Sequence, residues 1–423
     1  MRRWMMACLM AFSMMPVTAQ AAAPTVEDVL STYADIAHAA YSDSLITAKR
    51  LQGAIAALIG APSAGTHAAA KLAWEAARIP YQQTEAYRFG NPIVDAWEGR
   101  VNAWPLDEGL IDYVDTGRYG EASDENPYYT ANIIANPVLK IGGRTLETPQ
   151  ITTELIQDLN ELDSVEANVT TGYHAIEFLL WGQDLNGTGA GAGDRPYTDF
   201  APGDACSNGN CGRRAQYLQV AADLLVADLE EMVANWDQGG AARTQLMEAG
   251  DKGGLVMILT GMGSLSYGEL AGERMKLGLL LHDPEEEHDC FADNTHWSHY
   301  YDALGVRNVY QGRYVRIDGS IVEGPSVSDL VAATDANLDA TLSAALNGTM
   351  AKMTDIVLAA EAGEAYDQQI GEGNETGNAR VDAAITALLM QTREIERAVA
   401  ALGLDGLSIE GSDSLDNPAA VFQ

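Results

Sequence analysis

The sequence has few basic residues and no long apolar segment. Lys and Arg number 25 against 60 Asp and Glu, which gives a formal net charge of −35. Such a chain repels nucleic acid and anionic membrane surfaces, which excludes these classes of partner. Beyond the first 21 residues, the longest strictly apolar run is Ala54 to Ile59. A helix across a membrane needs about 20 apolar residues, so no transmembrane span is expected.

Cysteine is also scarce, and no Cys-x-x-Cys pair occurs, which argues against a zinc ribbon or a dithiol redox motif. Cys206 and Cys211 lie five residues apart in a loop rich in Gly and Asn. An oxidising compartment favours a local disulfide between them, and Cys290 is then left unpaired.

The first 21 residues have the pattern of a secretory signal peptide. Arg2 and Arg3 precede a largely apolar run, and Ala19-Gln20-Ala21 offers the small-x-small pattern of a signal-peptidase site. We therefore expect an exported protein, in the periplasm or associated with the outer membrane. Loss of the two arginines changes the net charge of the remaining chain to −37.

Helical periodicity is plentiful and strand patterns are scarce, which predicts an all-α fold. The helix series predicts two antiparallel helical bundles with long interdomain loops. The expected divisions are a signal peptide (1–21), an N-terminal bundle (22–184), a Gly-rich linker (185–212), a C-terminal bundle (213–405) and an acidic tail (406–423).

The segment 172–182 is the main candidate for function, because two side chains that can bind metal lie in an almost wholly apolar helix. His174 and Glu177 are three residues apart and share a helix face, so both can point at one ion or one water. Burial of an ionisable pair is costly unless the pair is hydrogen-bonded or bound to a cation. The alternative is that His174 and Glu177 bond only each other or a backbone group.

Several blocks of sequence together resemble the imelysin family. Gly172-Tyr173-His174-Ala175-Ile176-Glu177 has the Gly-x-His-x-x-Glu signature of that family. Three further blocks resemble its iron-regulated protein A branch: the run from Phe89 to Val114, Asp293 to His296, and Gly305 to Tyr310. The resemblance covers nearly the whole chain after residue 21. It implies two helical bundles with the signature helix at their interface.

The resemblance implies two different functions. Members of the family are exported and linked to bacterial iron uptake, whereas the founding member was described as an insulin-cleaving metallopeptidase of the outer membrane. The zinc-peptidase motif His-Glu-x-x-His is absent from this sequence. An imidazole with several carboxylates suits iron or manganese at least as well as zinc. The expected partners are therefore a metal ion or an iron chelate and an iron transporter of the outer or inner membrane, with a metallopeptidase as the alternative.

Two ligands are too few for an iron-type ion, so other segments or waters must complete the site. We expect Glu75 from the second helix, Asp107 after Pro105, and His296 from the polar segment 282–311 to join His174 and Glu177. The alternatives are a structural ion pair for Glu75 and a helix N-cap for Asp107. His288 and His299 are expected to be surface histidines, and His38 and His67 lie in ordinary helical sequence.

Overall fold

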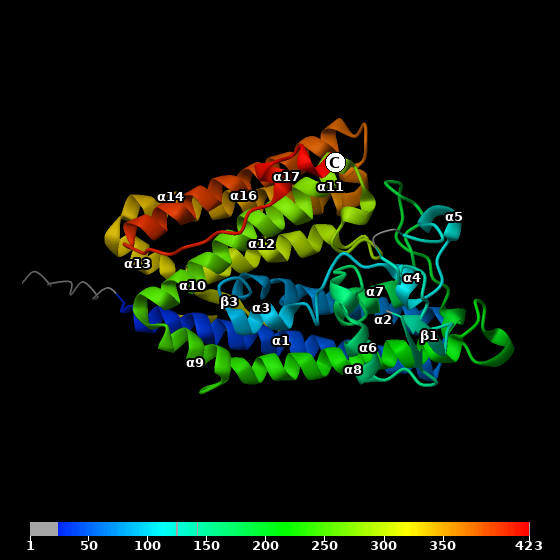
Figure 1. Cartoon of the computed structure of the whole chain (residues 1–423). Helices are drawn as coiled ribbons and strands as arrows, with labels where there is room; N and C mark the ends of the chain where they lie inside the picture. Colours follow the sequence, from blue (N-terminus) through cyan, green and yellow to red (C-terminus); the bar gives the residue numbers. More distant parts are fainter. Residues whose placement is uncertain (1–23, 124–125, 142, 423) are drawn as a thin grey trace, which may run out of the picture.

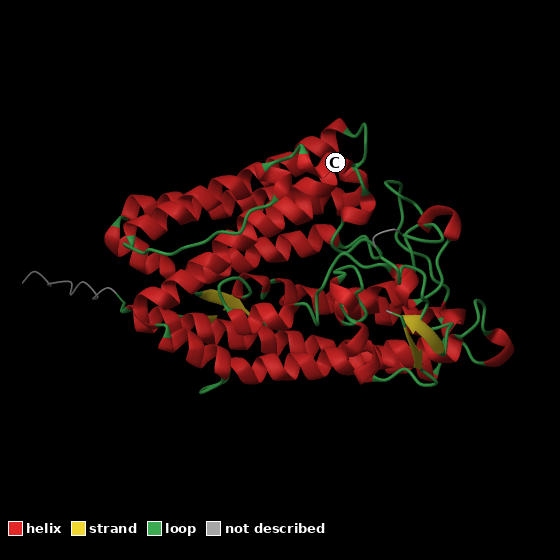
Figure 2. Ribbon diagram, viewed as in Figure 1, coloured by secondary structure: helices red, strands yellow, loops and turns green. Residues whose placement is uncertain are grey.

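The computed structural model describes residues 24–123, 126–141 and 143–422, and these residues are predominantly helical. Figure 2 shows helices throughout and only two small pairs of strands. The all-α prediction is therefore confirmed. The expected signal peptide, residues 1–21, lies outside the described residues. No described helix is long and apolar enough to cross a bilayer.

Helix α1 (Val26–Gly60) begins at a capping box, a pattern visible in the sequence, in which Thr25 and Asp28 bond each other's backbone amides. Helix α2 (Ala64–Gln82) starts after Ser63 and tolerates Pro80 close to its end. It does not continue to Arg88, because the chain turns into the 3₁₀ helix η1 (Glu85–Tyr87). Helices α1 and α2 pack closely along each other.

Residues 90–150 are a long connection that contains short elements. These are α3 (Pro92–Glu98), α4 (Glu108–Ile111), α5 (Thr116–Tyr119) and the antiparallel pair β1 (Val138–Ile141) and β2 (Arg144–Glu147). Helices α6 (Thr153–Leu159) and α7 (Gly172–Trp181) follow, with the 3₁₀ turn η2 (Leu162–Ser164) between them. The loop after α7 contains η3 (Tyr197–Phe200) and η4 (Gly203–Ala205), and a disulfide joins Cys206 to Cys211.

Helices α8 (Cys211–Trp236) and α9 (Ala241–Glu248) pack with the N-terminal helices, although the sequence placed them in the C-terminal bundle. The apolar side of α8 covers α1 and α7, and Figure 1 shows α8 and α9 in the same layer as α1. The chain enters the other layer only with α10 (Gly250–Ser264). The division into two domains stays a prediction, but these two helices belong to the N-terminal layer.

The C-terminal layer begins with one continuous helical run and ends with long antiparallel helices (Figure 1). The run consists of α10, the π-helix η5 (Leu265–Lys276) and α11 (Leu277–Leu281). The later elements are η6 (Pro284–Glu286), α12 (Thr295–Gln311), the hairpin β3 (Arg313–Val315) and β4 (Ile321–Glu323), α13 (Val327–Thr334), α14 (Ala336–Glu361), α15 (Tyr366–Ile370), α16 (Glu375–Ala401), α17 (Asp413–Asp416) and η7 (Ala420–Phe422).

The expected loose tail is partly packed. Residues 409–416 lie along the π-helix, where a Cβ added to Gly268 would be 2.6 Å from the backbone oxygen of Glu410. The hydroxyl of Ser414 donates to the carbonyl of Gly272 at 2.9 Å. Two glycines of the π-helix thus let the tail segment approach its backbone closely.

The two layers meet where α10 and α12 pack on α1, α2 and η1. Buried Arg274 of the π-helix joins them, because it donates to Glu85 of η1 at 2.7 Å and to Asp302 of α12 at 3.0 Å. It also donates to Glu269 at 2.8 Å. A π-helix can place residues five apart on one side, which explains the Glu269–Arg274 pair. Helix α7 and the segment between α11 and α12 lie at one end of this junction (Figure 1).

Candidate metal centre

Helix α7 is buried along its whole length, from Gly172 to Trp181. It begins at a glycine that no other residue can replace without strain, because Gly172 has φ +78° and a Cβ there would lie 2.3 Å from the carbonyl oxygen of Val101. The amide of Tyr173 donates to the same oxygen at 2.7 Å. The start of the helix is thereby held against residue 101, and its polar side chains have fixed positions.

His174 has one ring nitrogen bonded and one free. Its Nδ1 lies 3.0 Å from Oε2 of Glu177, and its buried Nε2 has no hydrogen-bond partner. Burial, followed by the charge of Arg78, holds the pKa of His174 well below its usual range, so the ring is neutral. When Nδ1 donates to the ionised form of Glu177, the neutral imidazole presents a lone pair at Nε2, which is the form that binds a metal.

Glu177 orients His174 and is itself held by the C-terminal half. Its Oε1 accepts a hydrogen bond from the amide of Ala292 at 3.0 Å, and its Oε2 is the atom that meets His174. Burial and then the charge of Asp289 raise the pKa of Glu177 well above its ordinary value. A carboxylate behind a ligating histidine is the usual arrangement at metal centres, so Glu177 fits the role of a positioning residue better than that of a ligand.

His288 and Asp289 face His174 from the segment between η6 and α12. Among the described residues, His174, His288 and Asp289 form the one group of such side chains whose ligand atoms all lie within 4.8 Å of one another. The rings of His174 and His288 meet edge to face with centroids 4.8 Å apart. Gln82 Nε2 at 3.3 Å and Arg78 Nη2 at 3.4 Å lie close to Nδ1 of His288.

Asp289 is an ionised and strongly bonded carboxylate. It accepts from Arg78 at 2.7 Å, from Asn294 Nδ2 at 2.8 Å and from the hydroxyl of Ser298. Burial raises the pKa of Asp289, but the charge of Arg78 and these hydrogen bonds hold it below its usual range. The position of this carboxylate is therefore fixed before any ligand binds.

Arg78 supplies the positive charge next to these groups. It also donates to Asn102 at 2.6 Å, and its guanidinium lies over the ring of Tyr173 at 5.1 Å. A cation at His174, His288 and Asp289 would share the site with this charge. Asp289 neutralises Arg78 locally, and a metal would draw the proton from Glu177 and so gain a second negative charge nearby.

A polar cavity of about 610 Å³ leads to His288 from outside, lined by residues of both layers. Its basic side chains are Arg88, Arg100 and Arg274, and six acidic side chains line it: Asp95, Glu98, Glu161, Glu166, Glu269 and Glu273. Burial raises the pKa of Glu98 to about 7. The excess of carboxyl groups makes the cavity an entrance that favours cations.

The other predicted ligands lie outside the group. Glu75 lines a separate cavity of about 330 Å³ beside Asn294 and Trp297. Asp107 precedes α4 as its N-cap residue and accepts from Asn126. His296 is buried in α12, and its Nε2 lies 4.0 Å from Oε1 of Glu361. The structure therefore brings together His174 and Glu177 but none of these three residues.

Two predictions about histidines were wrong. His288 and His299 were expected at the surface, and their side chains are 1% and 0% exposed. Asp289 was missed altogether. All three lie in a polar stretch of sequence, and their burial results from packing between the layers. The adjacent pair His288-Asp289 was the sequence signal that could have drawn attention to the segment.

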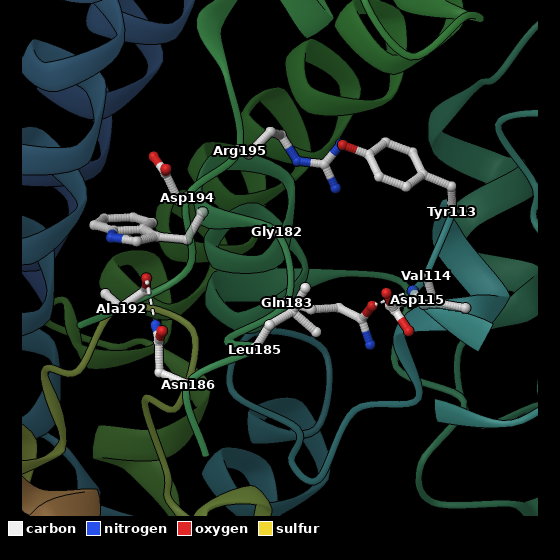
Figure 3. Close-up of a pocket in the computed structure, with 11 residues that line it drawn as sticks. Tyr113, Val114, Asp115, Gly182, Gln183, Leu185, Asn186, Ala192, Asp194 and Arg195 are labelled. Carbon is white, nitrogen blue, oxygen red and sulfur yellow. Dashed lines mark hydrogen bonds between the residues drawn. The ribbon is translucent and has the colours of Figure 1, made fainter. Parts of the chain in front are cut away.

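A further cavity of about 390 Å³ lies beyond the C-terminal end of α7 (Figure 3). Arg195 points across it toward Tyr113, with its guanidinium 4.9 Å from the ring. Arg195 also donates to Asp112 at 2.7 Å and to Asp199 at 3.1 Å. The bond to Asp112 ties the loop 182–210 to the first half of the chain, and the bond to Asp199 lies within the loop.

Comparisons with a family model, a curated protein and a solved structure agree on one family. The sequence model of the imelysin family (peptidase M75) matches residues 37–395. Iron-regulated protein A of Synechococcus elongatus is 24% identical over 283 residues, or 64% of this chain and 60% of that protein. A crystal structure from Parabacteroides distasonis, assigned as an iron-regulated protein A precursor, has a TM-score of 0.62 and 17% identity, covering 90% of this chain and 97% of that chain. This structural match shows a shared fold.

Proposed function

Because the chain belongs to the imelysin family, we propose that it is an exported metal-binding protein that takes part in bacterial iron uptake. The observation that carries the proposal is the free, buried Nε2 of His174 beside His288 and Asp289. A buried polar atom without a partner needs a reason, and a bound ion supplies one. The name of the Synechococcus relative supports iron as the biological metal.

The donor set fits such an ion. Two imidazoles and one carboxylate form the set found in non-haem iron centres, where further positions stay open to water or substrate. The same set also binds zinc and manganese, which are the alternatives. His174, His288 and Asp289 would hold the ion, and Glu177 would orient His174. When bound, the metal would supply a positive centre with open positions for water or a small chelating molecule.

The cavity beside the centre bears on how the metal arrives. It is acidic on balance and several times larger than an ion, so it can admit a hydrated cation or a small iron chelate. Its lining is dominated by charged and polar side chains and offers no broad apolar slot of the kind that a haem requires. The proposed setting is the periplasm, with an iron transporter of the outer or inner membrane as the partner.

The alternative function is a metallopeptidase. Two histidines, an aspartate and a nearby glutamate also make up a catalytic zinc site, in which the glutamate activates a water. In this protein both oxygens of Glu177 are already bonded, to His174 and to the amide of Ala292. Glu177 is thus already engaged in positioning His174, and this role favours metal binding without peptide hydrolysis.

Anaerobic isothermal titration of the mature protein with Fe²⁺, Mn²⁺ and Zn²⁺ tests the proposal. We expect His174→Gln, His288→Gln and Asp289→Asn each to weaken binding of the preferred metal by at least about 100-fold, and Glu177→Gln to weaken it by about 10- to 100-fold. His296→Gln is the matched control, because His296 lies outside the group and should leave the affinity unchanged.

Equal affinities in the parent and the His174→Gln/His288→Gln protein would overturn the proposal. A parallel incubation with insulin B chain addresses the alternative. Cleavage that a chelator stops and Glu177→Gln abolishes would establish the metallopeptidase instead.

A further inference from the structure

An apolar stripe of helix α2 is left partly exposed beside helix α12. Leu72, Ala76 and Ile79 recur at helical spacing on one face of α2. Leu72 is 63% exposed and Ile79 is 38% exposed, although an amphipathic helix usually buries such a stripe against a neighbour. The stripe borders a cavity of about 330 Å³, which we call the α2–α12 cavity. Its other lining residues are Glu75, Arg78, Asn294, Trp297 and Tyr301.

The wall that α12 contributes to this cavity is aromatic. Trp297 and Tyr301 lie one turn apart, and their rings are nearly parallel, at 21°, with centroids 5.6 Å apart. Tyr300 meets the ring of Trp297 edge to face, also at 5.6 Å. The indole nitrogen of Trp297 donates to Oε1 of Glu361 at 3.0 Å, which holds the ring against the end of α14. The two lining rings thus form one fixed aromatic surface next to the aliphatic side chains of α2.

Glu75 is the acidic residue of the lining. It lies on the same face of α2 as Leu72 and Ile79, and it makes no hydrogen bond or ion pair with any described residue. Burial raises the pKa of Glu75, the charge of Lys71 lowers it in part, and the charge of Glu361 raises it again. A half-buried carboxylate whose acceptor positions are free attracts a cationic donor.

The charge of Arg78, the basic residue of the lining, is already compensated. Arg78 is 1% exposed, and its Nη2 donates to Asp289 at 2.7 Å. Its guanidinium also lies over the ring of Tyr173, 5.1 Å from the ring centre. Both contacts engage the guanidinium with residues around the proposed metal centre. The charge that the cavity offers to a ligand is therefore that of Glu75, with Glu361 beside the aromatic wall, and it is negative.

We propose that the α2–α12 cavity binds a small organic cation, a primary ammonium group attached to an apolar body. The ammonium would donate to Glu75 and lie near the rings of Trp297 and Tyr301, because aromatic faces attract cations. The apolar body would cover Leu72 and Ile79 and remove their exposed surface from water. A volume of about 330 Å³ is at the lower end of the range of ligand pockets, which suits a small molecule. This site shares no ligand with the proposed metal centre.

Ligand-observed NMR titration of the mature protein, kept in a chelator, with three matched compounds tests the proposal. The compounds are 2-phenylethylamine, its neutral counterpart 2-phenylethanol and its acidic counterpart 3-phenylpropionate. We expect 2-phenylethylamine, which has about nine non-hydrogen atoms, to bind with a Kd below about 1 mM. The alcohol should bind at least about 10-fold more weakly, because it lacks the positive charge, and the carboxylate should not bind.

Two variants locate the binding site, and a third is the control. Glu75→Gln should weaken binding of 2-phenylethylamine by at least about 5-fold and remove its advantage over the alcohol. Trp297→Leu keeps an apolar side chain but removes the aromatic face, and it should weaken the amine by at least about 3-fold. Glu396→Gln should keep the parent's affinity, because Glu396 is an exposed residue of α16 outside the cavity. It controls for general attraction of amines to this acidic chain, and the Tm of each variant checks that the fold is intact.

The proposal is overturned if 2-phenylethylamine does not bind the parent, or if Glu75→Gln and Trp297→Leu both keep the parent's affinity. Tighter binding of 3-phenylpropionate than of the amine would also overturn it. Arg78, whose Nε has no hydrogen-bond partner, would then set the charge of the ligand. His174→Gln should bind the amine as the parent does, since it changes only the metal centre. None of these results depends on whether iron binds at His174.

Discussion

Buried carboxyl groups are the most informative residues of this protein. Some are neutralised by a buried arginine, as Asp289 is by Arg78. Others have no such partner, and their protonated form is favoured. Glu108 belongs to this second kind: burial and then the charge of Glu285 raise its pKa to about 8, and its nearest donor, Gln183 Nε2, is 3.5 Å away. An acid of this kind links the stability of the fold to pH.

We expect Glu108→Gln to stabilise the protein at alkaline pH and to have little effect at pH 5. The folded-state pKa of Glu108 is raised, so its stabilising contribution is fully present below the unfolded pKa, near 4.5. This contribution is lost as the pH rises toward 8, with a slope of up to about 1.4 kcal/mol per pH unit. Denaturant unfolding of both proteins at pH 5 and pH 9, in a chelator, measures the difference.

The exposed residue Glu372 provides the control, because Glu372→Gln removes one charge without changing a buried group. It should show the same small difference at both values of pH. A Glu108→Gln protein that gains nothing at pH 9 would show that the carboxyl is hydrated in the folded state.

At the residue scale, the sequence predicted only part of the candidate centre. His174 and Glu177 stood out because they interrupt an apolar helix, and helical geometry alone places them together. His288 and Asp289 could not be found in this way, because their neighbours in sequence are polar and their burial depends on the packing of α2 and α7 against them. His296 was preferred to His288 on the basis of the family-like block around it, and the structure places it beside Glu361 instead.

At the scale of elements, helix interiors were predictable and helix starts were less so. The capping box at Thr25 located the start of α1 correctly. Helix α7 begins only at Gly172, and the residues before it form a turn in which the amide of Asn168 bonds the carbonyl of Val165. The helical stretch 241–281 is interrupted at Gly250 and contains a π-helix. Such irregularities follow from tertiary contacts, which local periodicity does not contain.

A glycine pair tests the account of how α7 starts. We expect Gly172→Ala to destabilise the protein by roughly 1–3 kcal/mol or more, since alanine resists φ +78° and its Cβ would lie 2.3 Å from the carbonyl oxygen of Val101. Gly53→Ala is the matched control. Gly53 is an exposed residue of α1, and no heavy atom lies within 4 Å of a Cβ added there. This change should therefore stabilise the protein by up to about 1 kcal/mol.

The shift in the denaturation midpoint measures both changes. If Gly172→Ala unfolds at the same denaturant concentration as the parent, the start of α7 can move. The fixed placement of His174 would then need another explanation.

At the scale of the whole molecule, the candidate centre lies where the two layers meet. Helix α7 belongs to the N-terminal layer, and the segment with His288 and Asp289 connects α11 to α12 in the C-terminal layer. Three hydrogen bonds made by the backbone of that segment join it to the first half, in addition to the Arg78–Asp289 pair: Ala292 N to Glu177, Gly193 N to the Phe291 carbonyl, and Trp104 Nε1 to the Glu287 carbonyl. A metal with ligands from both layers would add a stronger connection at the same place.

Hydrogen exchange of the whole protein with and without Mn²⁺ tests this connection. An ion that binds only the folded protein stabilises the segments that supply its ligands. We therefore expect slower exchange in two separate segments, α7 and residues 287–293, with equal dependence on the concentration of Mn²⁺. The protection should disappear from both in His174→Gln and persist in both in His296→Gln. Protection of residues 287–293 alone would place the ion within the C-terminal layer, and the centre would then not connect the layers.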